Sequence, residues 1–94
     1  MMKMTKESYK QIFHEAITFT PDKFETMKPH RMINTGSSLL VSFQNESGNR
    51  RRAYEFTEKG HELVDAAYAT DEYFDRLAYS NWFSEVRLPE ACTF

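Results

Sequence analysis

The stretch Leu39-Leu40-Val41-Ser42-Phe43 decides the fold class, because its run of apolar and branched residues predicts a β-strand. Gln44 to Asn49 is a polar segment that contains Gly48, which is typical of a turn. Arg51 to Phe56 then alternates, with Arg52, Tyr54 and Phe56 on one side, as a returning strand does. Together these segments predict a β-hairpin spanning Leu39–Phe56.

Helical patterns precede the hairpin. From Thr5 to about Phe19, four apolar residues recur at helical spacing, and Thr5 can cap the first turn. Thr20-Pro21-Asp22 predicts the start of a second, short helix, which should end near Met27 because Pro29 disfavours helix at the residue before it. Residues 28–38 carry proline, glycine, asparagine and serine, so they are expected to form a loop or a poorly formed turn.

Two more helical segments are expected after the hairpin. Thr57 can cap a helix that turns Leu63 inward, and Thr70-Asp71-Glu72 resembles a new cap with an acidic first turn, leading a helix toward Val86. The expected fold is α+β, with N-terminal helices, one hairpin and one or two C-terminal helices in a single domain of residues 1–94. The expected core residues are Tyr9, Ile12, Phe13, Val41, Phe43, Phe56, Leu63, Phe74, Leu77 and Trp82.

The composition of the 94 residues is that of a folded globular protein, with 40% hydrophobic and 28% charged residues. Aromatic residues make up 15%, and such rings either build a core or gather at interfaces. The single cysteine, Cys92, makes no internal disulfide, and no apolar run approaches the ~20 residues that a membrane span needs. The first residues lack the apolar segment of a secretory signal, so a cytoplasmic protein with no membrane partner is expected.

Residues that could support catalysis or hold a metal ion are scattered. His14, His30 and His61 lie far apart and form no short histidine pair, and one cysteine gives no framework for zinc. The three glycines match neither common phosphate-binding spacing. A non-enzymatic protein without metal or cofactor is therefore expected, although catalytic groups can converge in space without being close in sequence.

Charge is distributed unevenly along the chain. Residues 1–59 contain ten Lys/Arg and seven Asp/Glu, which gives +3, whereas residues 60–94 contain two Arg and seven Asp/Glu, which gives −5. Two binding surfaces of opposite sign would produce this pattern, and so would an acidic helical face that is simply solvated.

Arg50, Arg51 and Arg52 stand at the mouth of the predicted hairpin, where planar guanidinium groups suit phosphate oxygens. The segment Leu39–Val64 resembles the wing and following helix of MarR- and PadR-type winged-helix DNA-binding proteins, with Phe56-Thr57-Glu58-Lys59-Gly60 at the position of their helix start. The resemblance implies a transcription regulator in which the three arginines contact the DNA. A recognition helix would occupy residues 26–38, where Pro29 and Gly36 depart from the pattern. The other possibility is that the arginines are a solvated strand start.

A protein-directed role is the alternative. Small proteins of phages and mobile elements that inhibit host complexes, including CRISPR and restriction systems, share no motif but are often short chains of this kind. A set of acidic residues could oppose a basic channel in such a target: Glu62, Asp65, Asp71, Glu72 and Asp75. A homodimer formed through the aromatic C-terminal helix is also possible under the first hypothesis.

Overall fold

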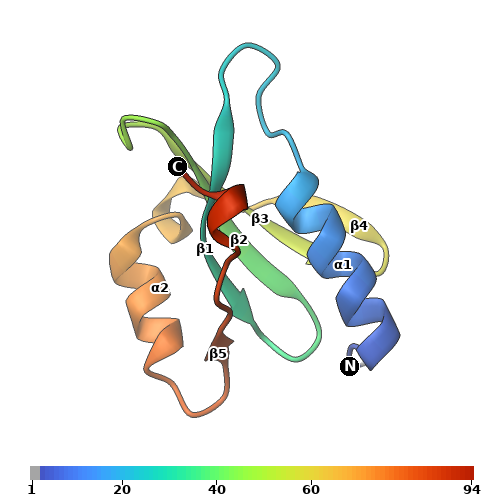
Figure 1. Cartoon of the computed structure of the whole chain (residues 1–94). Coiled ribbons are helices and arrows are strands. Elements are labelled where there is room, and N and C mark those ends of the chain that lie inside the picture. The colour runs from blue at the N-terminus through green and yellow to red at the C-terminus, as the bar shows by residue number, and fades with distance from the viewer. Residues whose placement is uncertain (1–2) are drawn as a thin grey trace.

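A five-stranded antiparallel sheet with one helix on each face forms the framework of the protein (Figure 1), as a computed structural model describes it for residues 3–94. The strands lie in the order β4-β3-β2-β1-β5. In chain order the elements are α1 (Lys6–Thr18), β1 (Met27–Asn34), β2 (Leu39–Asn45), β3 (Arg51–Thr57), β4 (Gly60–Leu63), η1 (Ala66–Tyr68), α2 (Asp71–Ala78), β5 (Ser84–Glu85) and η2 (Glu90–Cys92). The α+β class is confirmed. No helix within residues 3–94 is long and apolar enough to cross a membrane.

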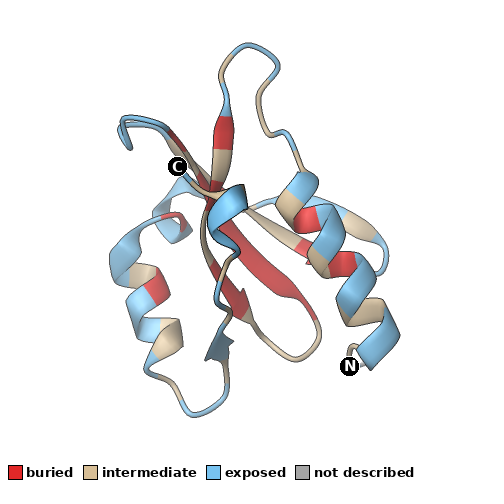
Figure 2. Cartoon of the chain, viewed as in Figure 1, coloured by how far each residue is buried: buried red, intermediate tan, exposed pale blue. Residues whose placement is uncertain are grey.

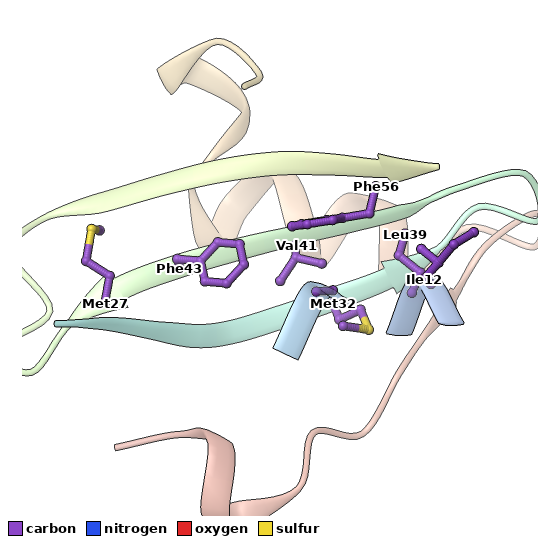
Figure 3. Close-up of a cluster of buried hydrophobic side chains, with 8 residues drawn as sticks. Ile12, Met27, Met32, Leu39, Val41, Phe43 and Phe56 are labelled. Atoms are coloured by element: carbon purple, nitrogen blue, oxygen red, sulfur yellow. The ribbon is translucent and has the colours of Figure 1, made fainter. Parts of the chain in front are cut away.

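Helix α1 covers one face of the sheet. Its start is fixed by a reciprocal cap, in which Thr5 and Ser8 each accept a hydrogen bond from the other's backbone N–H. The helix buries Ile12 and Ala16 against the strands, as Figure 3 shows for Ile12. The C-terminal segment after β5 runs beside α1 (Figure 1) and packs Val86 and Leu88 on the same cluster.

The opposite face of the sheet is covered by η1 and α2. Along β2, Leu39, Val41 and Phe43 belong to the α1 cluster, whereas Leu40 belongs to a second cluster built around Phe74 of α2. Because both faces of β2 are covered, all but one of its residues are buried (Figure 2). This explains why the strand is a nearly continuous apolar run without strict alternation.

The expected helix near Thr20 and the expected loop over residues 28–38 are both wrong. Residues 20–26 form a loop in which the Asp22 carboxylate accepts hydrogen bonds from the N–H groups of Phe24 and Glu25, and β1 follows. Pro29 is tolerated in β1 because β5 pairs with β1 only at Ile33 and Asn34, so the side of the strand facing away from β2 is open at Pro29. A bulge lies immediately after Pro29.

The helix expected to start at Thr57 is also wrong. Thr57 pairs with Gly60 across a two-residue turn, and the chain returns along β3 as strand β4. Gly60 has a φ of 126°, which only glycine adopts without strain, and the Thr57 hydroxyl accepts a hydrogen bond from Lys59 N–H. The hairpin of the winged-helix resemblance is therefore present as β2 and β3, but a strand replaces its following helix, and β1 lies where a recognition helix would.

The C-terminal helix begins as expected but is shorter. The Thr70 hydroxyl accepts a hydrogen bond from Tyr73 N–H, which confirms the predicted cap, and α2 ends at Ala78. The Ser80 side chain faces the N–H groups of Trp82 and Phe83, so the chain turns there. Trp82 is therefore exposed, and Leu63 is exposed on strand β4; both were wrongly assigned to the core. The remaining expected core residues are buried or packed against the two clusters.

Candidate binding surfaces

The hairpin arginines diverge to both faces of the sheet, and each is paired. Arg50, which is half exposed, lies 2.6 Å from the Glu25 carboxylate, and Arg52 donates to the Pro21 carbonyl at 2.8 Å and lies 3.2 Å from the Asp22 carboxylate. These contacts fasten the α1–β1 loop to the hairpin. The backbone N–H of Phe24 does most to hold the pKa of Asp22 below its ordinary value, and the two arginines add to this effect.

Arg51 points to the other face, toward the start of α2. Its guanidinium donates to Gln44 Oε1 at 2.8 Å and lies 3.3 Å from the Asp71 carboxylate. His30 Nε2 lies 3.0 Å from the same carboxylate. Partial burial raises the pKa of Asp71, but the hydrogen bond from His30 and the charge of Arg51 outweigh this and hold the pKa below its ordinary value.

Arg31 joins three elements beneath α2. Its side chain is 16% exposed and makes a bidentate pair with Glu85 of β5, at 2.7 and 2.9 Å. It also donates to the Asp75 carboxylate at 2.7 Å and to the Asp71 backbone carbonyl at 3.2 Å. The hydrogen bonds to Glu85, and then that to Asp75, raise the pKa of Arg31 above its already high ordinary value. The group is a permanent cation whose donors are used within the protein.

The five acidic residues that the sequence grouped together have different partners. Asp65 caps η1 by accepting the N–H of Ala67, while Asp71 and Asp75 bind basic groups of the sheet. Glu72 pairs with Arg76 one turn away on the outer side of α2, and Glu62 lies on β4 at the edge of the sheet. All five residues are exposed, but the carboxylates of Asp71 and Asp75 are partly engaged by basic groups of the sheet, whereas Glu62 has no such partner within residues 3–94.

Exposed aromatic rings gather where α2 ends. Tyr79 is 87% exposed and Trp82 is 86% exposed, three residues apart in the turn that follows the helix. Tyr79 continues the outer face of α2 that carries Glu72, Asp75 and Arg76, since these residues are spaced at i, i+3, i+4 and i+7. We call these five residues, Glu72, Asp75, Arg76, Tyr79 and Trp82, the α2 surface; Figure 2 shows the outer side of the helix exposed.

The described part of the chain assembles no cluster of metal ligands. No group of three or more His, Cys, Asp or Glu side chains there is placed to hold a metal ion. His61 packs 4.4 Å from the ring of Phe19, measured between centroids. A hollow of about 330 Å³ beside β5 is lined by His30, Arg31 and Arg87, but the donors of Arg31 already serve Glu85 and Asp75.

Sequence reasoning missed the α2 surface because it extended the helix through Trp82. The signal was present: Ser80-Asn81 directly after Tyr79 are residues that favour a turn over a helix interior. The partners of His30 and Arg31 had no such signal, since they lie about forty or more residues away in the chain. Comparison of the chain with protein-family models, with curated proteins and with solved structures finds no match.

Proposed function

We propose that this protein acts by binding another protein through the α2 surface, and not by catalysis. The observation that carries the proposal is the exposure of two large rings three residues apart, Tyr79 at 87% and Trp82 at 86%. Tyrosine, tryptophan and arginine dominate the binding energy of protein interfaces, because each buries a large area at little cost in side-chain entropy. Most other rings of this protein pack against the two clusters and against each other.

The charge of the α2 surface defines the partner's chemistry. Glu72 pairs with exposed Arg76, and Asp75 pairs with Arg31, whose side chain is mostly buried beneath the helix. The outer face therefore presents two carboxylates and one exposed arginine, which makes it weakly acidic around an aromatic end. A complementary partner carries an apolar pocket bordered by lysine or arginine. The basic nucleic-acid channel of a host complex is one surface of this kind. These residues therefore favour a protein that inhibits such a complex by binding at its channel.

The test uses Trp82, the single tryptophan of the chain. Wild-type protein is immobilised and exposed to a nuclease-treated lysate, beside Tyr79→Ala/Trp82→Ala and the control Phe24→Ala, whose ring is equally exposed on a distant loop. We expect wild type and control to retain a partner that the double variant loses. Purified partner should then shift the emission of Trp82 to shorter wavelength as the indole leaves water. Unchanged capture by the double variant would refute the proposal.

Nucleic-acid binding by the β2–β3 hairpin is the second candidate. It is favoured by the projection of the hairpin tip beyond the sheet (Figure 1), with half-exposed Arg50 at its base. To contact a phosphate, Arg50 must give up its ion pair with Glu25, which costs free energy. Protein binding through the α2 surface does not require this loss.

Arg50→Ala is the informative variant for this candidate, because Arg50 has the most exposed side chain of the three arginines. If the hairpin contacts the DNA backbone, duplex DNA should bind at low salt. The variant should then reduce the slope of log affinity against log salt by about one unit. Failure of wild-type protein to bind duplex or single-stranded DNA at low salt would remove this candidate and leave protein binding.

A further inference from the structure

Strand β4 forms one edge of the sheet and leaves backbone groups open. The Val64 N–H donates to the Ala53 carbonyl at 3.0 Å, which sets the hydrogen-bonding phase of the β3–β4 ladder. In an antiparallel pair the bonded residues alternate, so Glu62 bonds to β3 while the N–H and C=O groups of His61 and Leu63 point away from it. No described strand pairs with this outer side.

One face of this edge carries an exposed leucine beside a histidine. Leu63 lies opposite Tyr54, on the α1 side of the sheet, and is 64% exposed. His61 lies on the same side, against Phe19. Sheet edges are commonly protected by a short strand, a charged side chain, proline or a bulge. Strand β4 is short and carries Glu62, but it has no lysine, proline or bulge in its four residues. The edge thus combines free backbone donors and acceptors with an uncovered leucine.

The other face of the edge is acidic and lacks a counter-charge. Glu62 lies directly opposite Glu55, and like charges in this position destabilise a sheet. Glu55 accepts a hydrogen bond from the Ser38 hydroxyl at 2.9 Å, whereas Glu62 makes no hydrogen bond or ion pair with any described residue. A cation placed beside Glu62 by a neighbouring strand would relieve this repulsion.

We propose that the β4 edge binds an extended segment of a partner protein, which adds a sixth strand to the sheet. The segment has the pattern apolar–basic–apolar: its lysine or arginine lies beside Glu62, and the two flanking residues lie beside His61 and Leu63 on the α1 side. The flanking residues also form the backbone hydrogen bonds, since these are the positions where β4 has free groups. This surface is separate from the α2 surface and does not depend on Tyr79 or Trp82.

A second copy of the chain is a poorer occupant. In the symmetric antiparallel pairing that joins His61 of one copy to Leu63 of the other, Glu62 faces Glu62 of its mate. Four carboxylates, two from each copy, would then stand in one row across the two edges. A basic segment removes the repulsion that self-pairing would increase.

The experiment uses a short capped peptide in which valine and lysine alternate, and a matched peptide in which valine and glutamate alternate. Fluorescence anisotropy of labelled peptide measures binding to the whole protein. We expect the lysine peptide to bind wild type roughly tenfold more tightly than the glutamate peptide, and Glu62→Lys to reverse this preference. Tyr79→Ala/Trp82→Ala should bind the lysine peptide as wild type does, which separates this proposal from that for the α2 surface.

Amide hydrogen exchange gives the second measurement. In the free protein, the N–H groups of His61 and Leu63 should exchange faster than those of Glu62 and Val64, and the lysine peptide should slow the first pair. Leu63→Pro removes one outward N–H while leaving the hydrogen bonds between β3 and β4 intact. It should therefore lower the affinity for the lysine peptide without unfolding the protein. Equal binding of the lysine peptide by wild type and Glu62→Lys, an absence of binding to wild type, or concentration-dependent self-association through β4 would overturn the proposal.

Discussion

Single side chains connect parts of this protein that the sequence gives no reason to associate. Arg31 bonds to α2 and β5 at once, and His30 beside it reaches Asp71 because the bulge after Pro29 turns both residues to the same face. None of these partners follows from local sequence, since each depends on how the sheet places strands from opposite ends of the chain. Two helix caps, by contrast, were predictable from local sequence, since Thr5 and Thr70 cap as expected. At Thr20 and Thr57 the expected helices do not begin.

Replacing Arg31 by methionine should destabilise the protein. The change removes a partly buried cation and leaves the carboxylates of Asp75 and Glu85 without their partner, so we expect a loss of roughly 2 kcal/mol in the free energy of unfolding. Arg76→Ala is the matched control, because that guanidinium is 75% exposed and its single i,i+4 pair contributes only about 0.3–0.5 kcal/mol. Urea denaturation of both variants measures the difference, and equal losses would show that the Arg31 cluster adds no stability.

At the scale of elements, the sequence predicted correctly those helices and strands whose apolar pattern fits only one kind of element. The stripe of α1 and the strands β2 and β3 were predictable because each is a local period with clear boundaries. Pro29 indicated a break, yet β1 accommodates it where its outer side is unpaired. Thr57-Glu58-Lys59-Gly60 was expected to begin a helix, but the same four residues form a tight turn between β3 and β4. Short polar segments of this kind are decided by the strands that flank them.

Two leucine-sized side chains test this arrangement of elements. Ile12 of α1 is 2% exposed within the larger cluster, so Ile12→Ala should cost about 2–5 kcal/mol in the free energy of unfolding. Leu63 of β4 is 64% exposed, so Leu63→Ala should cost less than about 0.5 kcal/mol. Thermal and chemical denaturation would both report the contrast. A large loss for Leu63→Ala would instead support a helix over residues 57–67 with this leucine inside.

At the scale of the molecule, the uneven charge of the sequence has in part an internal explanation. The excess of basic residues in the first 59 positions meets the excess of acidic residues in the last 35, because Arg31 and Arg51 of the sheet bind Asp71, Asp75 and Glu85 of the C-terminal part. These contacts use three of the seven acidic residues in the last part, so part of the imbalance is internal. Two binding surfaces of opposite sign, or a solvated acidic face, stay predictions for the rest. Because of these internal contacts, the sequence could not locate the acidic candidate site. Acidic residues that are close in the chain have different roles, because some pair with arginines of the sheet and others face solvent.

Acid should therefore destabilise the protein at two sites, the contacts made by Asp22 and those made by Asp71. The pKa values of Asp22 and Asp71 lie below their ordinary 3.8 in the folded protein, so the unfolded chain takes up protons first as pH falls. Their contribution to stability is complete above that ordinary value and is lost as pH decreases through the lowered folded-state pKa values. Melting temperature should accordingly be nearly flat from pH 7 to about 5 as far as these groups are concerned, and then fall.

The double variant Asp22→Asn/Asp71→Asn isolates this effect. It should melt at a lower temperature than wild type at neutral pH, because the α1–β1 loop and the start of α2 lose their charged partners Arg52, Arg51 and Arg50. The difference from wild type should shrink as the wild-type carboxylates become protonated, so the two melting curves converge in acid. Glu72→Gln, on a side chain that is 79% exposed, should follow wild type across the whole range. If the difference in melting temperature between the double variant and wild type stays constant down to the lowest pH at which both are folded, these two carboxylates do not contribute to the pH dependence of stability.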